Sequence, residues 1–509
     1  MTDHNTELSR EQIAEVLEEI ALLLELKGEN PFKVRAYRNG AEIARSFDGD
    51  IVARAAAGEL KGIKGIGEAL QDKLHELAST GELEFHRNLR GEFPDSLFEL
   101  FEIQGLGPKK IKVLHDELGV ASLGALRRAC EAGKVASLKG FGQKTADKIL
   151  AAIEVYERFS GRYVLAEVAP LAEIIRERLQ DHPAAARVEV AGSYRRGKET
   201  VHDLDFLVAT KKPTDLIRFF TGMGEVAEII AAGDTKASVR LENGLQCDLR
   251  AVSSGEFPFA LMYFTGSKEH NVALRSIALK QGLTLNEYAL TPLAKETEAP
   301  SEFVNPIHDE EGIYRELGLC YIPPSLRENR GELESAEEGT LPRLVSLENL
   351  RGTFHCHTKE SDGRSTLEEM ATAALDLGLG YLGISDHSKS SFQANGLDEN
   401  RLMAQVEAIR DLNERFDGIQ IFAGSEVDIL RDGSLDFPDE ILASLDFTVV
   451  SVHASFSLDQ SEMTKRVIRA MENPHVTMLG HLTGRLLLRR EPYAIAHEKI
   501  IDCAAETNT

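Results

Sequence analysis

The sequence lacks long apolar runs and is poor in cysteine. No run of about 18 apolar residues, the length that spans a membrane, occurs along the chain. The opening residues, Met-Thr-Asp-His-Asn-Thr-Glu, also lack the basic and then apolar order of a secretion signal. The five cysteines are scattered and form no Cys-x-x-Cys pair, which is typical of reduced thiols. We therefore expect a cytoplasmic protein with no membrane partner.

Positive charge is scarce as well. The chain of 509 residues carries 58 Lys and Arg against 83 Asp and Glu, a formal net charge of −25. Taken alone, this excess of acid argues against nucleic acid, because contacts to phosphate need Lys and Arg. The charge is unevenly spread, however, since residues 103–158 hold ten Lys or Arg and six Asp or Glu. A solvated acidic protein of several domains stays an alternative until the motifs are considered.

The first third of the chain shows the apolar period of amphipathic helices, beginning with Ile13, Val16, Leu17 and Ile20. Three Gly-x-Gly turns separate helical segments there. A single such turn indicates only a helical hairpin, but three copies favour a grip on the DNA backbone, since backbone N–H groups at a helix N-terminus can meet phosphate. The glycines are Gly65 and Gly67, Gly105 and Gly107, and Gly140 and Gly142.

A Gly-Ser turn follows a predicted strand at residues 188–191. Gly192 and Ser193 could hold a triphosphate with their backbone donors, and Arg196 would add charge. The spacing from Gly192 to Lys198 also resembles the start of a Walker A loop. That alternative fails because Glu199 stands where the loop needs Ser or Thr.

Three aspartates follow this turn along the chain. Period-two alternation puts Asp203 and Asp205 on one face of a predicted strand. Asp248 lies in a strand that follows an Asn-Gly hairpin turn, so it could complete a cluster that holds two divalent cations. An isolated Asp-x-Asp is more often a surface pair or part of a calcium loop, so the pattern gains its meaning from the neighbouring motifs.

In the last third, short apolar strands alternate with helical segments, the rhythm of a βα barrel or a wound sheet. Histidines and carboxylates recur at the predicted strand ends, where residues of a barrel converge on one mouth. A single His is more often a satisfied core residue, but this repetition predicts a metal site. Its residues are His355, His357, Asp362, His387, Glu426, His453 and His481.

The motifs together resemble the family X DNA polymerases of the bacterial and archaeal type, which carry a C-terminal polymerase and histidinol phosphatase (PHP) domain. The resemblance implies that Asp203, Asp205 and Asp248 are catalytic ligands of Mg²⁺ or Mn²⁺. One departure is His202, where many members have Gly. The resemblance also implies that the sugar and the minor groove of the nascent pair are held by Tyr263, Phe264, Gly266, Asn271 and Arg275.

The resemblance extends to both ends of the chain. Lys33 and Tyr37 match the part that binds the 5′ side of a gap, and Lys73 matches the Schiff-base lysine of members with deoxyribose-phosphate lyase activity; a solvated Lys is an equal alternative. The PHP domain implies Mn²⁺ or Zn²⁺ and 3′–5′ exonuclease chemistry. Its final Asp-x-His ligands have no match before Thr509, so we expect a C-terminally truncated PHP domain with weak or no nuclease activity.

We therefore expect a monomeric multidomain polymerase that fills short gaps, with gapped or primer-template DNA and deoxynucleoside triphosphates as partners. A DNA-binding scaffold with a degenerate site and a PHP phosphoesterase are the alternatives. The predicted fold joins an α-helical helix-hairpin-helix region, an α+β palm and thumb, and an incomplete βα barrel. The expected domains are a helical domain over 1–85, a fingers-like region over 86–160, a palm over 161–255, a thumb over 256–325, a linker over 326–349 and the PHP domain over 350–509.

Overall fold

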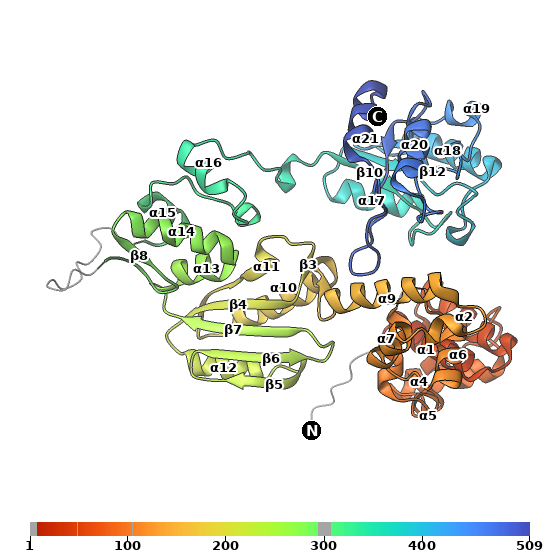
Figure 1. The fold of residues 1–509 in the computed structure, drawn as a ribbon, viewed down its shortest axis with the longest axis horizontal. Helices are drawn as coiled ribbons and strands as arrows, with labels where there is room; N and C mark the ends of the chain where they lie inside the picture. Colours follow the sequence, from red (N-terminus) through yellow and green to blue (C-terminus); the bar gives the residue numbers. More distant parts are fainter. Residues whose placement is uncertain (1–7, 48, 104, 294–306) are drawn as a thin grey trace. The chain divides into compact units, whose positions relative to one another are not determined.

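The computed structural model describes residues 8–47, 49–103, 105–293 and 307–509. The chain divides into two units, of which one comprises residues 1–158 together with 351–509 and the other residues 159–350. Figure 1 shows the helices and strands in sequence colours. Among the described residues, no helix combines the length and the apolar character that crossing a membrane requires.

The N-terminal part is entirely helical over its described residues. A capping box between Ser9 and Gln12 starts the first helix, and Gly28 in the left-handed conformation ends it. Three hairpins follow, each with a Gly-x-Gly turn, and they agree with the expected arrangement. The helices are α1 (Arg10–Lys27), α2 (Pro31–Ser46), α3 (Ile51–Ala56), α4 (Glu68–Thr80), α5 (Glu84–Arg90), η1 (Asp95–Glu102), α6 (Pro108–Leu118), α7 (Leu123–Glu131), α8 (Lys134–Ser137) and α9 (Gly142–Phe159).

The palm is a five-stranded sheet in the order β2-β4-β7-β6-β5. Strands β4 and β7 are parallel, and the Asn-Gly turn joins β6 to β7 as an antiparallel hairpin, as the sequence predicts. The elements are β1 (Tyr163–Val164), α10 (Leu165–Asp181), β2 (Ala185–Val190), α11 (Gly192–Arg195), β3 (Thr200–Val201), β4 (Asp203–Thr210), α12 (Pro213–Thr221), β5 (Val226–Ala232), β6 (Lys236–Leu241) and β7 (Gln246–Val252).

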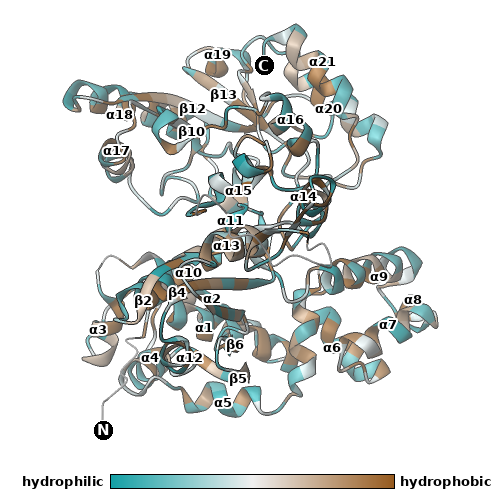
Figure 2. Cartoon of the chain, turned by 90° about the vertical axis from the view of Figure 1, so that its left-hand side faces the viewer, coloured by the Kyte–Doolittle hydropathy of each residue, from teal (hydrophilic) through white to brown (hydrophobic). Residues whose placement is uncertain are grey.

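Alternation along β4 assigns each face of the sheet a different role. Leu204, Phe206 and Val208 belong to the core that contains α10 and α12. Leu207 and Ala209 belong instead to a smaller core with α13 (Phe257–Thr265), a helix drawn mostly in brown in Figure 2 because its residues are apolar. Odd-numbered positions of β4 therefore face away from α10 and α12, and this places the strand's two aspartates on the α13 face.

The thumb continues through α14 (Lys268–Lys280), β8 (Leu283–Leu285), β9 (Leu290–Pro292), α15 (Glu310–Glu316) and η2 (Pro324–Leu326). The first half of the stretch expected as a linker over 326–349 contains a helix, α16 (Glu332–Glu338). Leu333 and Ala336 are buried in the thumb core with Tyr314. The charged sequence of this stretch belongs to a short amphipathic helix, whose apolar residues the run of charges obscures.

The C-terminal part is a curled parallel sheet in the order β10-β11-β12-β13-β14. Helices connect its successive strands, as the βα rhythm predicts, and the sheet does not close in the described residues. The elements are η3 (Leu347–Asn349), β10 (Gly352–Cys356), α17 (Leu367–Asp376), β11 (Tyr381–Ile384), η4 (Phe392–Ala394), α18 (Glu399–Arg415), β12 (Gln420–Asp428), α19 (Asp439–Leu442), β13 (Phe447–Ser451), α20 (Gln460–Met471), β14 (Met478–Leu479) and α21 (His497–Thr507).

Candidate active sites in the palm and the half-barrel

The structure brings the three predicted aspartates of the palm together. Asp205 on β4 lies directly opposite Asp248 on β7 in the parallel pairing, and Asp203 lies two residues before Asp205 on the same face. Asp205 and Asp248 line a cavity of about 150 Å³ with Arg250 and Phe264. Two neighbouring strands therefore place three carboxylates on one face of the sheet, and two of these carboxylates line one small cavity.

The electrostatics of this cluster favour a cation. Burial, followed by the charges of Asp203 and Asp248, raises the pKa of Asp205 to about 7. Burial also raises the pKa of Asp203, against the opposing charge of His202. One buried oxygen of Asp248, Oδ1, has no hydrogen-bond partner among the described residues. Hard oxygen ligands and an unsatisfied buried carboxylate fit divalent cations such as Mg²⁺ or Mn²⁺.

The Gly-Ser turn lies against this cluster. Gly192 has a φ of +62°, and a Cβ added there would lie 2.3 Å from Oδ2 of Asp205. A side chain at this position would therefore displace the aspartate. The turn needs glycine for its conformation and for its close approach to the carboxylates.

Arg196, the predicted triphosphate ligand, contacts the thumb in this structure. Its Nε donates to Oε1 of Glu328 at 2.8 Å and its Nη1 donates to the carbonyl oxygen of Thr265 at 2.6 Å. Lys198 Nζ lies 3.4 Å from the same Glu328 oxygen. Burial would raise the pKa of Glu328, but the hydrogen bonds and charges of Arg196 and Lys198 together lower it. Glu328 therefore binds the face of Arg196 that an anionic ligand would bind. No motif in the sequence predicted this contact.

A buried ionic cluster joins the same turn to the thumb. Arg195 donates to both oxygens of Glu310, at 3.0 and 2.7 Å, and Arg327 Nη1 donates to Glu310 Oε1 at 2.5 Å. Burial opposes ionisation, but the two arginines keep the pKa of Glu310 below its usual value. Arg327 is fully buried. Such a cluster fixes geometry, since removing one member would leave a buried charge unpaired.

The residues predicted at the sugar lie at the α13–α14 junction. Asn271 Nδ2 donates to the carbonyl oxygen of Tyr263 at 2.6 Å, and the Tyr263 and Phe264 rings pack edge to face with centroids 5.2 Å apart. Gly266 has a φ of +32°. A Cβ there would meet Asn271 at 2.6 Å, which explains why the turn carries glycine. Arg275, the fifth residue of this set, is exposed on α14.

The helical part places the predicted glycines at the starts of three helices. Gly65, Gly105 and Gly140 have φ of +95°, +86° and +91°. Gly67 caps α4, Gly107 caps α6 and Gly142 begins α9. Each turn therefore directs the free N–H groups of a helix start outward, the geometry that suits a phosphate oxygen.

Lys73 and Lys33 share an aromatic neighbour in this part. The ammonium of Lys73 lies 5.0 Å from the ring centroid of Phe85, and that of Lys33 lies 5.7 Å from it. Tyr37 stacks on the same ring with centroids 6.1 Å apart. Lys33, Tyr37 and Lys73, which are separated along the sequence, are thus gathered around one phenyl ring.

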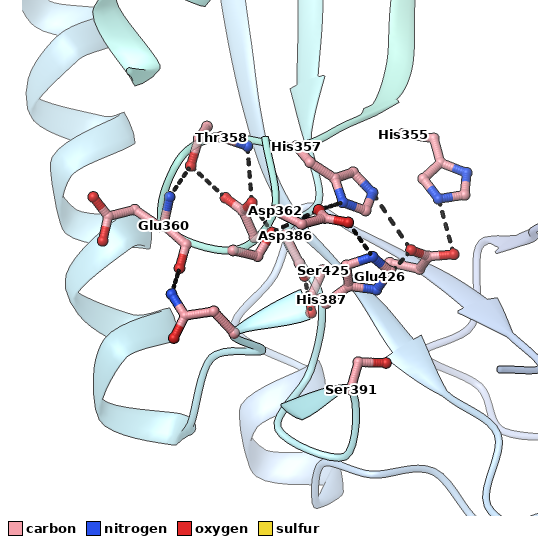
Figure 3. A network of polar contacts seen from close by, with 12 residues as sticks. His355, His357, Thr358, Glu360, Asp362, Asp386, His387, Ser391, Ser425 and Glu426 are labelled. Atoms are coloured by element: carbon pink, nitrogen blue, oxygen red, sulfur yellow. Dashed lines mark hydrogen bonds and ion pairs between the residues drawn. The ribbon is translucent and has the colours of Figure 1, made fainter. Parts of the chain in front are cut away.

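In the half-barrel, histidines from four strand ends surround Glu426. Figure 3 shows three of them, His355, His357 and His387, beside this carboxylate. Glu426 is only 1% exposed. Although burial alone would raise its pKa, the surrounding imidazoles hold that pKa far below the usual range. The nitrogen-to-oxygen distances to Glu426 are 3.0 Å for His355, 3.4 Å for His357, 3.0 Å for His387, 3.3 Å for His453 and 2.8 Å for His481.

Three groups of these residues have ligand atoms close enough to share a cation. They are His355, His357 and Glu426; His357, Asp362 and His387; and His387, Glu426 and His453. His357 Nδ1 lies 2.9 Å from Asp362. Mixed imidazole and carboxylate ligands suit Zn²⁺ or Mn²⁺. His481 contacts Glu426 but belongs to none of the three groups among the described residues.

Two acidic residues support this cluster and were absent from the predicted set. Asp428 Oδ1 lies 2.8 Å from Nδ1 of His453, and with Glu426 it raises the pKa of His453 to about 9 against the effect of burial. Asp386 accepts from the backbone N–H of Thr358 at 2.8 Å and so anchors the loop that carries Asp362. The signal for Asp428 was its position two residues after Glu426, on the same face of β12.

The backbone at the cluster is strained. His355 has a φ of +62°, in the left-handed region that side chains other than glycine rarely adopt. Its Nε2 nevertheless reaches Glu426. Strain of this kind persists where the surroundings impose it, which is common at functional sites.

Comparisons with known proteins agree with this division of the chain. The helical part matches a helix-hairpin-helix domain over residues 9–83 and a SAM-like helix-hairpin-helix tandem over 98–154. The following parts match the DNA polymerase beta palm over 164–227 and the DNA polymerase beta thumb over 260–328. A PHP domain matches residues 353–506.

Individual relatives extend these matches. The chain is 36% identical over 504 residues to the DNA polymerase/3′-5′ exonuclease PolX of Bacillus subtilis, covering 99% of this chain and 86% of that protein. It is 24% identical over 339 residues to rat DNA polymerase lambda, covering 62% of this chain and 56% of that protein. Its C-terminal part is 31% identical over 161 residues to a probable phosphatase of Caldicellulosiruptor saccharolyticus, covering 30% of this chain and 61% of that protein. The chain therefore belongs to the family X DNA polymerases that carry a C-terminal PHP domain.

Proposed function

We propose that this protein is a DNA-directed DNA polymerase that fills short gaps, and that its PHP domain processes 3′ ends as a 3′–5′ exonuclease. The pairing of Asp205 with Asp248, beside Asp203, carries the first part. The three carboxylates are half-buried, and the charges of Asp203 and Asp248 act unfavourably on Asp205. A divalent cation would neutralise this repulsion. The substrates are deoxynucleoside triphosphates and gapped or primer-template DNA, and the protein acts as a monomer.

The palm reaction joins a nucleotide to the primer. The primer 3′ hydroxyl gives up its proton to solvent, and its oxygen forms a bond to the α-phosphorus. The bond from the α-phosphorus to the bridging oxygen breaks, and pyrophosphate leaves with that electron pair. Mg²⁺ or Mn²⁺ held by the three aspartates would lower the pKa of the attacking hydroxyl and neutralise the leaving group. Gly192, Ser193 and Arg196 hold the triphosphate, and Tyr263, Phe264 and Gly266 hold the sugar. Asn271 and Arg275 contact the nascent pair.

Primer extension tests the palm. A one-nucleotide gap with a 5′ phosphate is filled in Mg²⁺ and in Mn²⁺, with the wild type compared with Asp248→Ala. We expect extension by the wild type alone. The control is Asp215→Ala, which removes an exposed carboxylate of α12. Absence of extension by the wild type in both metals would favour a DNA-binding scaffold instead.

The PHP reaction removes a 3′-terminal nucleotide. The oxygen of a water forms a bond to phosphorus, the bond to the preceding 3′ oxygen breaks, and that oxygen takes up a proton, which releases a nucleoside 5′-monophosphate. Glu426 and its histidines would hold Mn²⁺ or Zn²⁺, which supply Lewis acidity. The five imidazoles around one ionised carboxylate support this assignment.

The 3′ activity is tested on single-stranded DNA labelled at its 5′ end, without nucleotides. The sequence alone led us to expect weak or no nuclease activity, but five imidazoles surround Glu426 in the structure. We therefore expect shortening by the wild type in Mn²⁺ and none by Glu426→Gln. A control variant, Glu440→Gln, removes an exposed carboxylate of the same domain. Wild-type protein that leaves the strand intact would remove the exonuclease from the proposal and leave the polymerase.

A deoxyribose-phosphate lyase at Lys73 is the second candidate activity. Its supporting observation is the gathering of Lys73 and Lys33 around Phe85, which puts the amine expected to attack the sugar aldehyde beside a second basic side chain and an aromatic ring. Borohydride reduction on a 5′ deoxyribose-phosphate end should trap a covalent adduct with the wild type and with Lys61→Ala. No adduct should form with Lys73→Ala, and an undiminished adduct there would exclude this lysine.

A further inference from the structure

A second cavity adjoins the histidine cluster of the half-barrel. Its volume is about 470 Å³, and His387 and His453 form part of its lining. Phe392 and Arg431 also line it, although the hydrolysis described above uses neither. Cavities of roughly 300 to 1,000 Å³ hold small ligands. The cavity is therefore large enough for one nucleotide and is open to the proposed metal ligands.

Phe392 is exposed over 79% of its surface, a large apolar side chain left in water. The short loop that carries it is nevertheless anchored. Ser390 donates through its N–H and its hydroxyl to Asp436, at 2.7 and 2.6 Å. Ser391, seen in Figure 3, donates to Asp428 at 2.6 Å. The ring is thus presented by a held loop, which lowers the entropic cost of stacking a ligand on it.

The lining of the cavity also carries positive charge. Arg466 is buried, and its guanidinium donates to the carbonyl oxygens of Leu430 and Ala454, both at 2.8 Å, and to that of Ile429. These bonds fix the chain next to Arg431, whose own side chain is exposed. The guanidinium of Arg466 is used in bonds to the backbone, whereas the exposed guanidinium of Arg431 can bind an anion that enters the cavity.

We propose that this cavity is the subsite for the 3′-terminal nucleotide, with its base stacked on Phe392 and its phosphate between Arg431 and the histidine cluster. The proposal rests on the exonuclease function proposed above. An aromatic ring, a guanidinium and a metal cluster around one cavity match the three parts of a nucleotide: base, phosphate and reacting bond. Stacking accepts every base, so the subsite selects a nucleotide without selecting a sequence.

A kinetic experiment removes the terminal base of the DNA and the phenyl ring of Phe392 separately. The wild type should degrade single strands that end in adenosine about tenfold more efficiently, in kcat/KM, than strands that end in an abasic analogue, as expected for one stacked base. In Phe392→Ala this ratio should fall toward one through a higher KM for the adenosine end, and Phe392→Tyr should restore it. Leu377→Ala, which removes a side chain that is 77% exposed at the end of α17, should keep the wild-type ratio. A ratio unchanged in Phe392→Ala would overturn the subsite.

A binding experiment tests the subsite without turnover. Titration calorimetry of deoxyadenosine 5′-monophosphate in Mn²⁺ is carried out on the full chain with Asp205→Ala, so that the palm does not contribute. Adding Phe392→Ala should weaken binding about tenfold, while deoxyribose 5-phosphate should bind both proteins equally. If the two ligands bind both proteins alike, the subsite is wrong. If the stacking effect is present but no strand is shortened, the exonuclease proposal fails and the subsite stands.

Discussion

The palm and the half-barrel both gather groups for divalent cations, but their electrostatics are opposite. In the palm, three carboxylates share one face of the sheet, and burial together with their mutual repulsion raises the pKa of Asp205 to about 7. In the half-barrel, one carboxylate lies among five imidazoles, which hold the pKa of Glu426 far below its usual value. The carboxylates of the palm therefore repel one another until a cation neutralises them. In the half-barrel, by contrast, Glu426 stays ionised at every ordinary pH.

The difference suggests how each site responds to metal. Carboxylates that repel one another lose charge by taking up protons when no cation is present, so protons and cations compete there near neutral pH. In the half-barrel the competition takes place at the histidines, since a nitrogen must be unprotonated to bind a metal. Each of the following variants alters either the palm site or the half-barrel site.

The largest effects should come from removing the central carboxylate of either site. Asp205→Asn should reduce primer extension about a thousandfold or more and leave 3′ shortening intact, and Glu426→Gln should do the reverse, because each loses a ligand worth several kcal/mol in the transition state. Both reactions are measured on one preparation of each variant. Loss of both reactions in either variant would mean that the two sites are not independent.

A smaller loss should follow Asp428→Asn in the half-barrel. Asp428 contacts Nδ1 of His453 and so fixes which nitrogen faces Glu426. Removing such a partner typically weakens metal affinity about 10- to 100-fold. Mn²⁺ affinity is measured by the metal dependence of 3′ shortening, with Asp411→Asn on α18 as an exposed control. An unchanged Mn²⁺ dependence would show that His453 needs no partner.

The repulsion in the palm should be visible as a pH dependence of stability. The pKa of Asp205 is higher in the folded chain than the ordinary 3.8, so the folded state holds its proton more tightly. The tighter proton binding stabilises the folded chain fully below about pH 4. This stabilisation, on the order of 2 kcal/mol after allowance for coupling, is lost as the pH rises to about 7. In EDTA the Tm of the wild type should fall relative to Asp205→Asn across this window, and Mg²⁺ at pH 8 should reverse the loss. Parallel curves would contradict the raised pKa.

The smallest effect concerns the thumb carboxylate at the nucleotide turn. Glu328→Gln removes the charge that engages Arg196 and Lys198, so Arg196 should become more available to a triphosphate. We expect the KM for deoxynucleoside triphosphates to fall about threefold, the scale of a partly exposed ion pair. Glu334→Gln, on the exposed side of α16, is the control. A higher KM would instead mean that Glu328 positions Arg196 for binding.

The palm was the part most fully predicted from the sequence. Asp203 and Asp205 share a face because strand alternation requires it, and the Asn-Gly turn predicted the hairpin that brings Asp248 into register. Local rules of this kind act over two residues or one turn, which is why they can be applied without a structure. The strand-end histidines followed from an equally local pattern, repeated along the chain.

Contacts between distant segments were not predictable in the same way. Arg327 is fully buried although arginine is almost always at the surface, and its partner Glu310 gives no local signal. The helix α16 was taken for linker because its charges hide two buried apolar residues. Asp428 could have been found from its spacing to Glu426, but its contact with His453 depends on how β12 and β13 pair.

The ionic contacts at the Gly-Ser turn also have a consequence for synthesis. Arg195 bonds to a residue 115 positions later and Arg196 to one 132 positions later. A ribosome that adds about 5 to 20 residues per second needs roughly 7 to 26 seconds to make the longer of these two stretches. Until then the turn is on a nascent chain without its partners. The catalytic face of the palm is therefore completed only after the end of the thumb has emerged, and a pause between the two would prolong the life of an unfinished polymerase.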